Sequence, residues 1–355
     1  MGTTNIPEPP LVSVVVPFYN VGDYAEACLA SLAAQTFERC ESLCVDDGST
    51  DVTPRTLARF ADAEPRSRVH RIKHAGLSVA RNRGVELARA ELVSFVDGDD
   101  VVSPRYVQTL YEAYVRELAY SRGGRTLAMV QSRRVLPREM PVEWPDPTGV
   151  ETEVLEGIEA LRRLLIGRFG CAAWGGIAPR ELYLDAPFPP GLLFEDAYVT
   201  PEHIAHVDRV VVLHAPLYGY VVRDGSITRR PRFTKKAVED IRASAVHIRE
   251  LAPYWDDRTQ SLAKWRIATR YRSVMWQALG LHDRRASRYL CKEATVFMRT
   301  NARHLARLRH ENRLPARSLI GFFVVGYLPL LCWLMRAMLD LLPMDCRQAL
   351  VNRMK

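Results

Sequence analysis

Three short apolar runs decide the fold of this chain: Val14-Val15-Val16-Pro17-Phe18-Tyr19-Asn20, Val45-Asp46-Asp47-Gly48-Ser49-Thr50-Asp51 and Phe95-Val96-Asp97-Gly98-Asp99-Asp100. Each run stops at Asn, Asp or Gly, which is typical of a buried parallel strand leaving a sheet. In open α/β sheets, ligands bind outside the carboxyl ends of the strands. We therefore expect these ends to line one pocket. Because clustered carboxylates repel one another unless a cation lies among them, the pattern predicts a divalent metal and a phosphate-bearing ligand.

Strands and helices alternate strictly through the front half, which is typical of a parallel, doubly wound sheet. The predicted strands are Ser13–Pro17, Glu41–Val45, Val69–Lys73, Leu92–Val96 and Thr126–Ser132. The predicted helices are Tyr24–Gln35, with Asp23 as its cap, Thr53–Ala61, Leu77–Ala88 and Pro104–Ala119.

The pattern is less regular further along. It predicts a loop over Val135–Thr152, a helix over Val154–Ile166, and two strands, Asp208–His214 and Leu217–Val222. From Thr234 onward every predicted element is a helix.

Charge divides the chain into two parts. The net charge is +8, but residues 1–228 hold 23 Lys and Arg against 31 Asp and Glu, a net of −8. Residues 229–355 hold 26 against 10, a net of +16. Such a tail is suited to an anionic membrane surface or to nucleic acid. It lacks interleaved aromatic residues and any motif that reads bases, so we expect no nucleic-acid partner.

The tail also carries an apolar stretch, Leu319–Met335, of 17 residues without a charge. That is the lower limit for a membrane span, and Pro329 interrupts it. Arg299, Arg303 and Arg307 precede it on one helix face, so we expect the segment 319–342 to anchor at a membrane surface or to pack as a buried helix. The scattered cysteines and the absence of a signal-peptide pattern predict a cytoplasmic protein, peripheral on the inner face of the cell membrane.

Four motifs in this order resemble the family 2 glycosyltransferases, enzymes with the nucleotide-diphospho-sugar-binding GT-A fold. They are VSVVVPFYNVGDYAEACLASLAAQTF, ESLCVDDGSTD, AGLSVARNRGVELARAELVSFVDGDD and GLLFEDAYV. The match is dense over residues 11–102 and looser over residues 171–228. The resemblance implies a doubly wound, mostly parallel α/β sheet in residues 1–232, the catalytic domain, and a basic helical C-terminal region in residues 233–355.

The resemblance also implies roles for the residues that match each motif on the nucleotide side. The strand end at Pro17 and Tyr19 would form the nucleoside-binding turn. Asp47 would hydrogen-bond the base, typically uracil. Arg81 and Asn82 match the Ala-Arg-Asn segment on the helix that borders the donor site.

The remaining motifs imply the chemistry. Asp97-Gly98-Asp99 matches the family's Asp-x-Asp motif, in which Asp99 would hold Mn²⁺ or Mg²⁺ against the diphosphate and Asp97 would face the ribose or the sugar. Gly98 lets the backbone turn so that the two acids converge. Asp196 would be the catalytic base that activates the acceptor hydroxyl. A single base opposite the leaving group implies inversion at the anomeric carbon.

The chain departs from the family in two places. Many relatives carry Trp-Asn-Lys-Leu-Tyr where this chain has Trp174-Gly175-Gly176-Ile177-Ala178, so a lysine at the acceptor edge is missing. The Gln-x-x-Arg-Trp motif of processive synthases is also absent, which implies transfer of one sugar per encounter. The implied reaction uses a UDP-sugar and a glycan or lipid-linked acceptor in bacterial surface polysaccharide assembly.

Other functions stay open at this point. A nucleotidyltransferase shares this kind of sheet but normally has a Gly-rich loop after the first strand. A non-catalytic, membrane-recruited scaffold that binds nucleotide-sugars is the alternative from another class.

Single residues also have structural alternatives. Asp47 could cap a helix, Asp196 could be an N-cap for the segment 197–205, and Arg81 could be a solvated helix residue. One of the histidines at positions 203, 206 and 214 could complete a metal shell. The patterns do not specify the donor sugar, the acceptor or the oligomeric state.

Overall fold

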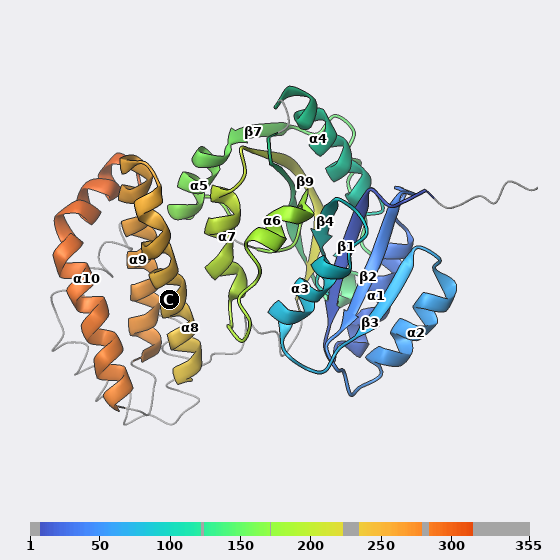
Figure 1. Cartoon of the computed structure of the whole chain (residues 1–355), viewed down its shortest axis with the longest axis horizontal. Helices are drawn as coiled ribbons and strands as arrows, with labels where there is room; N and C mark the ends of the chain where they lie inside the picture. Colours follow the sequence, from blue (N-terminus) through green and yellow to red (C-terminus); the bar gives the residue numbers. More distant parts are fainter. Residues whose placement is uncertain (1–7, 122–123, 171, 223–233, 279–283, 315–355) are drawn as a thin grey trace, which may run out of the picture. The chain divides into compact units, whose positions relative to one another are not determined.

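The computed structural model describes residues 8–121, 124–170, 172–222, 234–278 and 284–314 (Figure 1). The chain divides into two compact units. The first comprises residues 1–160 and 172–224, and the second comprises residues 161–171 and 225–355. The predicted domain boundary at residues 232 and 233 falls outside the described residues.

The first unit is built on one mixed sheet with the strand order β3-β2-β1-β4-β8-β6-β9-β5, and β7 pairs with β9. Strands β3, β2, β1 and β4 are parallel, whereas β8 runs antiparallel to both of its neighbours. The strands are β1 Val12–Phe18, β2 Cys40–Asp46, β3 Ser67–Arg71, β4 Leu92–Phe95, β5 Val101–Val102, β6 Thr126–Val135, β7 Thr152–Glu156, β8 Gly176–Pro179 and β9 Arg209–Val221.

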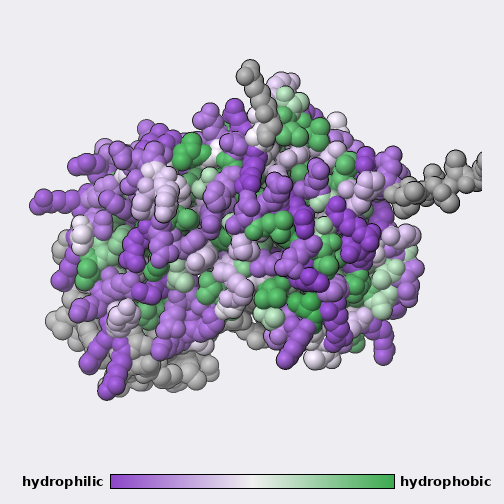
Figure 2. Space-filling model, viewed as in Figure 1, coloured by the Kyte–Doolittle hydropathy of each residue, from purple (hydrophilic) through white to green (hydrophobic). Residues whose placement is uncertain are grey.

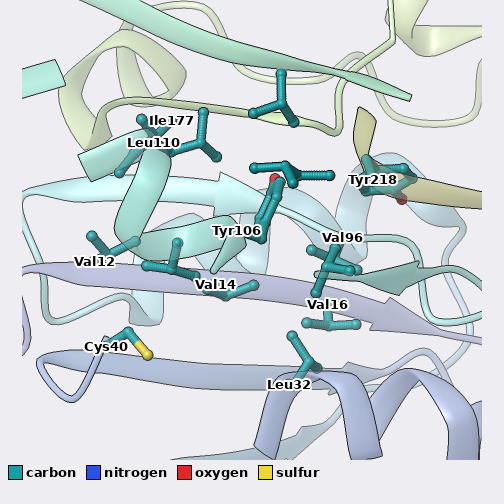
Figure 3. Packing of buried hydrophobic residues seen from close by; sticks show 14 of the residues in the cluster. Val12, Val14, Val16, Leu32, Cys40, Val96, Tyr106, Leu110, Ile177 and Tyr218 are labelled. Atoms are coloured by element: carbon teal, nitrogen blue, oxygen red, sulfur yellow. The ribbon is translucent and has the colours of Figure 1, made fainter. Parts of the chain in front are cut away.

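Helices cover both faces of this sheet. Successive residues of a strand point to opposite faces, and every residue of β1 is buried, so both faces need a cover. On one face, Val14 and Val16 of β1 pack with α1 and α4 in the main core (Figure 3). On the other face, Val15 contacts α3 so closely that a Cβ on Gly84 would lie 2.2 Å from its side chain. The helices of the first unit are α1 Gly22–Ala33, α2 Thr53–Ala63, α3 Leu77–Leu87, α4 Tyr106–Tyr120, α6 Arg180–Asp185 and α7 Glu195–Ala205, with the 3₁₀ turn η1 Pro137–Glu139. Helix α5 Gly157–Leu165 begins in the first unit and ends in the second.

The three polar strand ends lie side by side, as the sequence predicts. Phe18 pairs with Asp46 across β1 and β2, and the N–H of Asp47 donates to the Phe18 carbonyl over 2.8 Å. On the other side of β1, the N–H of Gly98 donates to the Pro17 carbonyl over 3.2 Å. Main-chain hydrogen bonds therefore hold the first three motifs at one edge of the sheet.

Several predicted elements differ from the structure. The segment 154–156, predicted as helix, belongs to strand β7, and α5 begins only at Gly157. Strand β8 and helix α6 were not predicted. The two predicted strands Asp208–His214 and Leu217–Val222 are one strand, β9, with an irregular register opposite Gln131 that accommodates Pro216.

The cap predicted for the first helix is also wrong, because α1 has Val21 at its N-cap position. The side chains that accept N–H groups there come from the loop after β2 and from the first residue of α2. Asp51 accepts from Gly22 over 3.0 Å, and Thr53 accepts from Val21 over 3.1 Å.

The second unit is helical, as predicted, with α8 Lys235–Leu251, η2 Ala252–Tyr254, α9 Asp257–Ala278 and α10 Arg284–Glu311. The hydroxyl of Thr234 caps α8 by accepting from the Ala237 N–H. No helix among the described residues is both long enough and apolar enough to span a membrane. Arg299, Arg303 and Arg307 are exposed on α10, and hydrophilic residues dominate the face shown in Figure 2. The predicted anchoring segment 319–342 lies outside the described residues.

Candidate active site

The centre of the site is the acidic turn that follows β4. One carboxylate oxygen from each of Asp97, Asp99 and Asp100 lies within 4.8 Å of the others. Asp97 and Asp99 are partly exposed, whereas Asp100 is buried. Three carboxylates at this spacing repel one another, so the chain must stabilise the turn with other contacts.

Gly98 allows the turn to approach β1 closely. A Cβ at this position would lie 2.6 Å from the Phe18 ring and 2.7 Å from the Pro17 carbonyl oxygen. The glycine is thus required by a close approach of two backbone segments. Pro17 itself is buried in the strand, and its predicted contact with a nucleoside stays a prediction.

Strand β9 holds the turn from the other side through Tyr218. The Tyr218 hydroxyl donates to Asp100 Oδ2 over 2.7 Å and accepts the N–H of Asp97 over 3.1 Å. Asp100 Oδ1 accepts the N–H of Val221 over 2.8 Å. Burial raises the pKa of Asp100 well above its usual range, and the neighbouring acids add to the effect. Trp174 stacks on the Tyr218 ring with centroids 4.2 Å apart, so Tyr218 links the turn to the segment before β8.

Arg81 on α3 joins two motifs that lie far apart in the sequence. Its Nη2 donates to Asp97 Oδ1 over 2.7 Å, and its Nη1 donates to Glu195 Oε1 over 2.5 Å. The side chain is only 2% exposed, so the alternative of a solvated helix residue is wrong. Burial alone would lower the pKa of Arg81, but the carboxylates of Asp97 and Glu195 outweigh it and raise the pKa.

Glu195 and Asp196 open helix α7. Phe194, the residue at the N-cap position, has a left-handed backbone with φ of 63°, which is unusual for a bulky residue and typical of constrained sites. Asp196 lies within the first turn, so the N-cap alternative does not apply. Its Oδ1 accepts the Ala197 N–H over 2.6 Å, and its charge contributes to the raised pKa of Arg81.

Asn82, next to Arg81, binds a neighbouring loop. Its amide donates to the Phe188 carbonyl over 2.8 Å and accepts the Phe188 N–H over 2.9 Å. These paired bonds fix the chain that leads into α7. The predicted contact of Asn82 with the donor stays a prediction.

The part of the site that is predicted to bind the nucleoside contains Tyr19, Asp47 and a residue that was not predicted, His74. Tyr19 is exposed beyond the end of β1, and its ring stacks on that of His74. Asp47 is buried and binds the loop after β3 through both of its oxygens. The predicted hydrogen bond from Asp47 to a base stays a prediction.

Sequence inspection missed the roles of His74, Asp100 and Tyr218 and the bridge made by Arg81. The third acid of the turn was a visible signal for Asp100. Nothing in the sequence indicated the pairing of Arg81 with a residue 114 positions away. His203 is a structural histidine, because its Nε2–H donates to the Ala186 carbonyl over 2.7 Å and burial lowers its pKa to about 4.

The donor set of the turn fits a hard divalent cation. Mg²⁺ and Mn²⁺ take carboxylate oxygens and keep several waters, so one or two protein carboxylates suffice. Asp99 and Asp97 are partly exposed and can supply such oxygens, although Asp97 Oδ1 also accepts from Arg81. Asp100 is buried and is bonded to Tyr218 and Val221. Among the described residues, this turn is the one place where three potential ligand groups gather.

Comparisons with known proteins find similarity to glycosyltransferases. The family model described as glycosyl transferase family 2 matches residues 13–157. The chain is 31% identical over 223 residues to Glycosyltransferase GlyA of Streptococcus pneumoniae, covering 61% of this chain and 31% of that protein. It is 39% identical over 92 residues to the putative teichuronic acid biosynthesis glycosyltransferase TuaG of Bacillus subtilis, covering 26% of this chain and 36% of that protein.

A solved structure has the same fold. The TarS fragment 1–349 of S. aureus, in complex with UDP-GlcNAc, matches with a TM-score of 0.64 at 22% identity, covering 88% of this chain and 90% of that one. The predicted GT-A fold with a C-terminal helical extension is confirmed. The chain spans between 31% and 64% of the length of three curated relatives that it matches.

Proposed function

We propose that this chain, whose residues 13–157 match the model of glycosyl transferase family 2, is an inverting, metal-dependent glycosyltransferase. It moves one sugar from a nucleotide-diphospho-sugar to a hydroxyl group of a glycan or lipid-linked acceptor. The observation that carries this proposal is the buried Arg81 bridge. One guanidinium holds both Asp97 of the metal-binding turn and Glu195, the neighbour of Asp196.

The bridge supports a division of roles across the site. Charge-assisted hydrogen bonds from a planar guanidinium are directional, and Arg81 makes one to each carboxylate, so it restrains both Asp97 and Glu195. Asp97 is thereby held on the donor side, and the first turn of α7 is held on the acceptor side. Preorganised charges of this kind are effective because they need no rearrangement during the reaction.

Asp99, with Asp97 beside it, would hold Mn²⁺ or Mg²⁺. When bound, the cation neutralises the charge that develops on the departing diphosphate. Gly98 and Tyr218 keep the turn in place, since one allows the approach to β1 and the other anchors the main chain at Asp97. The protein thus supplies a rigid acidic turn at the edge of the sheet where ligands of this fold class bind.

Asp196 acts as the base in this proposal. A hydroxyl group is a poor nucleophile until a carboxylate takes its proton. Asp196 is partly exposed, and the adjacent Glu195 is committed to Arg81, so Asp196 is the acid of the pair that can reach an acceptor. A single base on the acceptor side gives in-line displacement, and hence inversion.

Similarity to two known proteins and the charge of α10 support a donor, an acceptor and a location. The TarS structure contains UDP-GlcNAc, which supports a uridine nucleotide as the donor carrier. The likeness to TuaG supports an acceptor in bacterial surface polysaccharide assembly. The exposed basic residues of α10 support a cytoplasmic enzyme that binds the anionic inner face of the membrane.

Calorimetric titration of UDP with and without Mn²⁺ tests the proposal. We expect Mn²⁺ to tighten UDP binding in the wild type, and Asp99→Asn to remove that gain while binding without metal stays unchanged. Asp23→Asn, in the first turn of α1, is the matched control and should behave as wild type. The proposal would be contradicted if Mn²⁺ did not change the affinity of the wild type for UDP, or if Mn²⁺ tightened UDP binding to Asp99→Asn as much as to the wild type.

A further inference from the structure

An exposed pair of stacked rings lies beyond the strand ends. Tyr19 follows β1 and His74 follows β3, and their ring centroids are 4.0 Å apart with an interplanar angle of 13°. Tyr19 is 44% exposed and the His74 side chain is 52% exposed. A flat aromatic surface in solvent at the ligand-binding edge of this sheet is suited to a nucleobase.

Asp47 contacts the His74 ring and the main chain that follows it. Asp47 Oδ1 accepts the Ala75 N–H over 2.7 Å, and its Oδ2 accepts the Gly76 N–H over 2.9 Å. His74 Nδ1 lies 2.9 Å from the same Oδ2. The Asp47 side chain is 4% exposed and both of its oxygens are engaged by the loop, so it offers a ligand much less surface than His74 does.

This contact determines which nitrogen of His74 carries the proton. An ionised carboxylate can only accept hydrogen bonds, so its contact with Nδ1 needs a donor on the ring. A neutral histidine that carries its proton on Nδ1 presents Nε2 as an acceptor. Within the described part of the chain, no hydrogen bond to Nε2 of His74 occurs.

We propose that His74, positioned by Asp47 and stacked on Tyr19, selects uridine nucleotides over cytidine nucleotides. The imide N3–H of uracil is a donor that Nε2 can accept, whereas N3 of cytosine is itself an acceptor. A hydrogen bond to Nε2 lies in the ring plane, so stacking on Tyr19 leaves that edge accessible. The inference rests on the proposed function and assigns base selection to His74, with Asp47 as a positioning residue.

The test is titration of the full-length chain with UMP and CMP in EDTA, which removes any metal contribution. The two nucleotides have nearly the same shape, so their affinity ratio isolates the contact at N3. We expect the wild type to bind UMP about ten-fold more tightly than CMP, the size of one net hydrogen bond in a partly exposed site.

Three variants and a control separate the contributions. His74→Phe keeps a ring on Tyr19, so affinity for both nucleotides should persist while the ratio falls to about one. His74→Ala should lower the ratio and weaken both nucleotides. Asp47→Asn should also lower the ratio, although Asp47 does not touch the base. His70→Ala, on β3 and bonded to Arg83, should leave the ratio unchanged.

Two results would overturn the inference alone. One is a wild-type ratio near one for a protein that binds UDP. The other is a His74→Phe variant that keeps the preference while Asp47→Asn loses it, since Asp47 would then contact the base directly. If the wild type binds neither UMP nor UDP under any metal condition, the proposed function itself fails.

Discussion

Replacing Arg81 with Met should lower the stability of the first unit. The change removes the cation between Asp97 and Glu195 but keeps an apolar stem of similar length. Removing one partner of a buried ion pair costs about 3–5 kcal/mol, because the remaining charge is left uncompensated. Asp97 is 23% and Glu195 10% exposed, so water screens part of the repulsion and the lower end, about 3 kcal/mol, is expected.

Thermal unfolding measures this cost. A domain of 150–250 residues loses about 2–4 °C in Tm per kcal/mol, so Arg81→Met should lower the transition of this unit by about 6–12 °C. Arg81→Lys keeps the charge but cannot make both directed bonds, and its loss should be about half as large.

The matched control is Arg83→Met on the same helix. Arg83 is 39% exposed and pairs with Glu86 three residues along, so its loss should cost less than about 0.5 kcal/mol. A transition in Arg81→Met within 2 °C of that in Arg83→Met would refute the argument that the bridge holds the site together.

Three further predictions concern the turn, the buried histidine and the tail. Gly98→Ala forces a Cβ to within 2.7 Å of a backbone carbonyl and should cost about 1–3 kcal/mol and weaken Mn²⁺-dependent UDP binding, whereas Gly170→Ala, with open space around it, should do neither; calorimetry that finds them equal contradicts this. Because burial lowers the pKa of His203 to about 4, the unfolded chain binds the proton more readily, so stability that is present above pH 6.5 should be lost by about 3 kcal/mol as the pH falls to 4. Urea titrations at both pH values should show a smaller loss of unfolding free energy in His203→Gln than in the wild type. An equal loss in both proteins would exclude His203 as the cause of the pH dependence. Replacing the exposed α10 residues Arg299, Arg303 and Arg307 with Gln should weaken binding to anionic vesicles about 10²-fold, at about 1 kcal/mol per charge, and leave binding to neutral vesicles unchanged. Equal sedimentation of the wild type with both vesicle types would show that the charge serves another purpose.

The strands of the sheet were predictable where apolar runs alternate with amphipathic helices along the chain. The prediction failed where pairing with distant segments determines the strand. The first four strands are apolar runs followed by amphipathic helices, and each element lies within a few residues of its prediction. Strand β8 contains Gly176 and Pro179 in only four residues, so no local pattern marks it, and its strand geometry comes from pairing with β4 and β6. Two strands were predicted where the chain forms the single strand β9, because the irregular register opposite Gln131 accommodates Pro216 between them.

The acidic turn was predictable for the same reason that the sheet was. Parallel strands bring their carboxyl ends to one edge, so Asp97 and Asp99 follow from the order of the apolar runs. The contacts that hold them do not follow, because Arg81 and Tyr218 reach the turn from other elements of the fold. The hydrogen bonds between Asp47 and the loop after β3 depend on the main-chain path from His74 to Gly76, which no spacing rule specifies.

The most direct test of the central claim is UDP release from a panel of UDP-sugars in the presence of Mn²⁺. Water can replace the missing acceptor slowly, so a transferase should release UDP from at least one donor, and the base that activates an acceptor should also activate that water. We expect Asp196→Asn to abolish release while UDP binding, measured by calorimetry, stays near the wild-type value. Undiminished UDP release by Asp196→Asn would contradict the account.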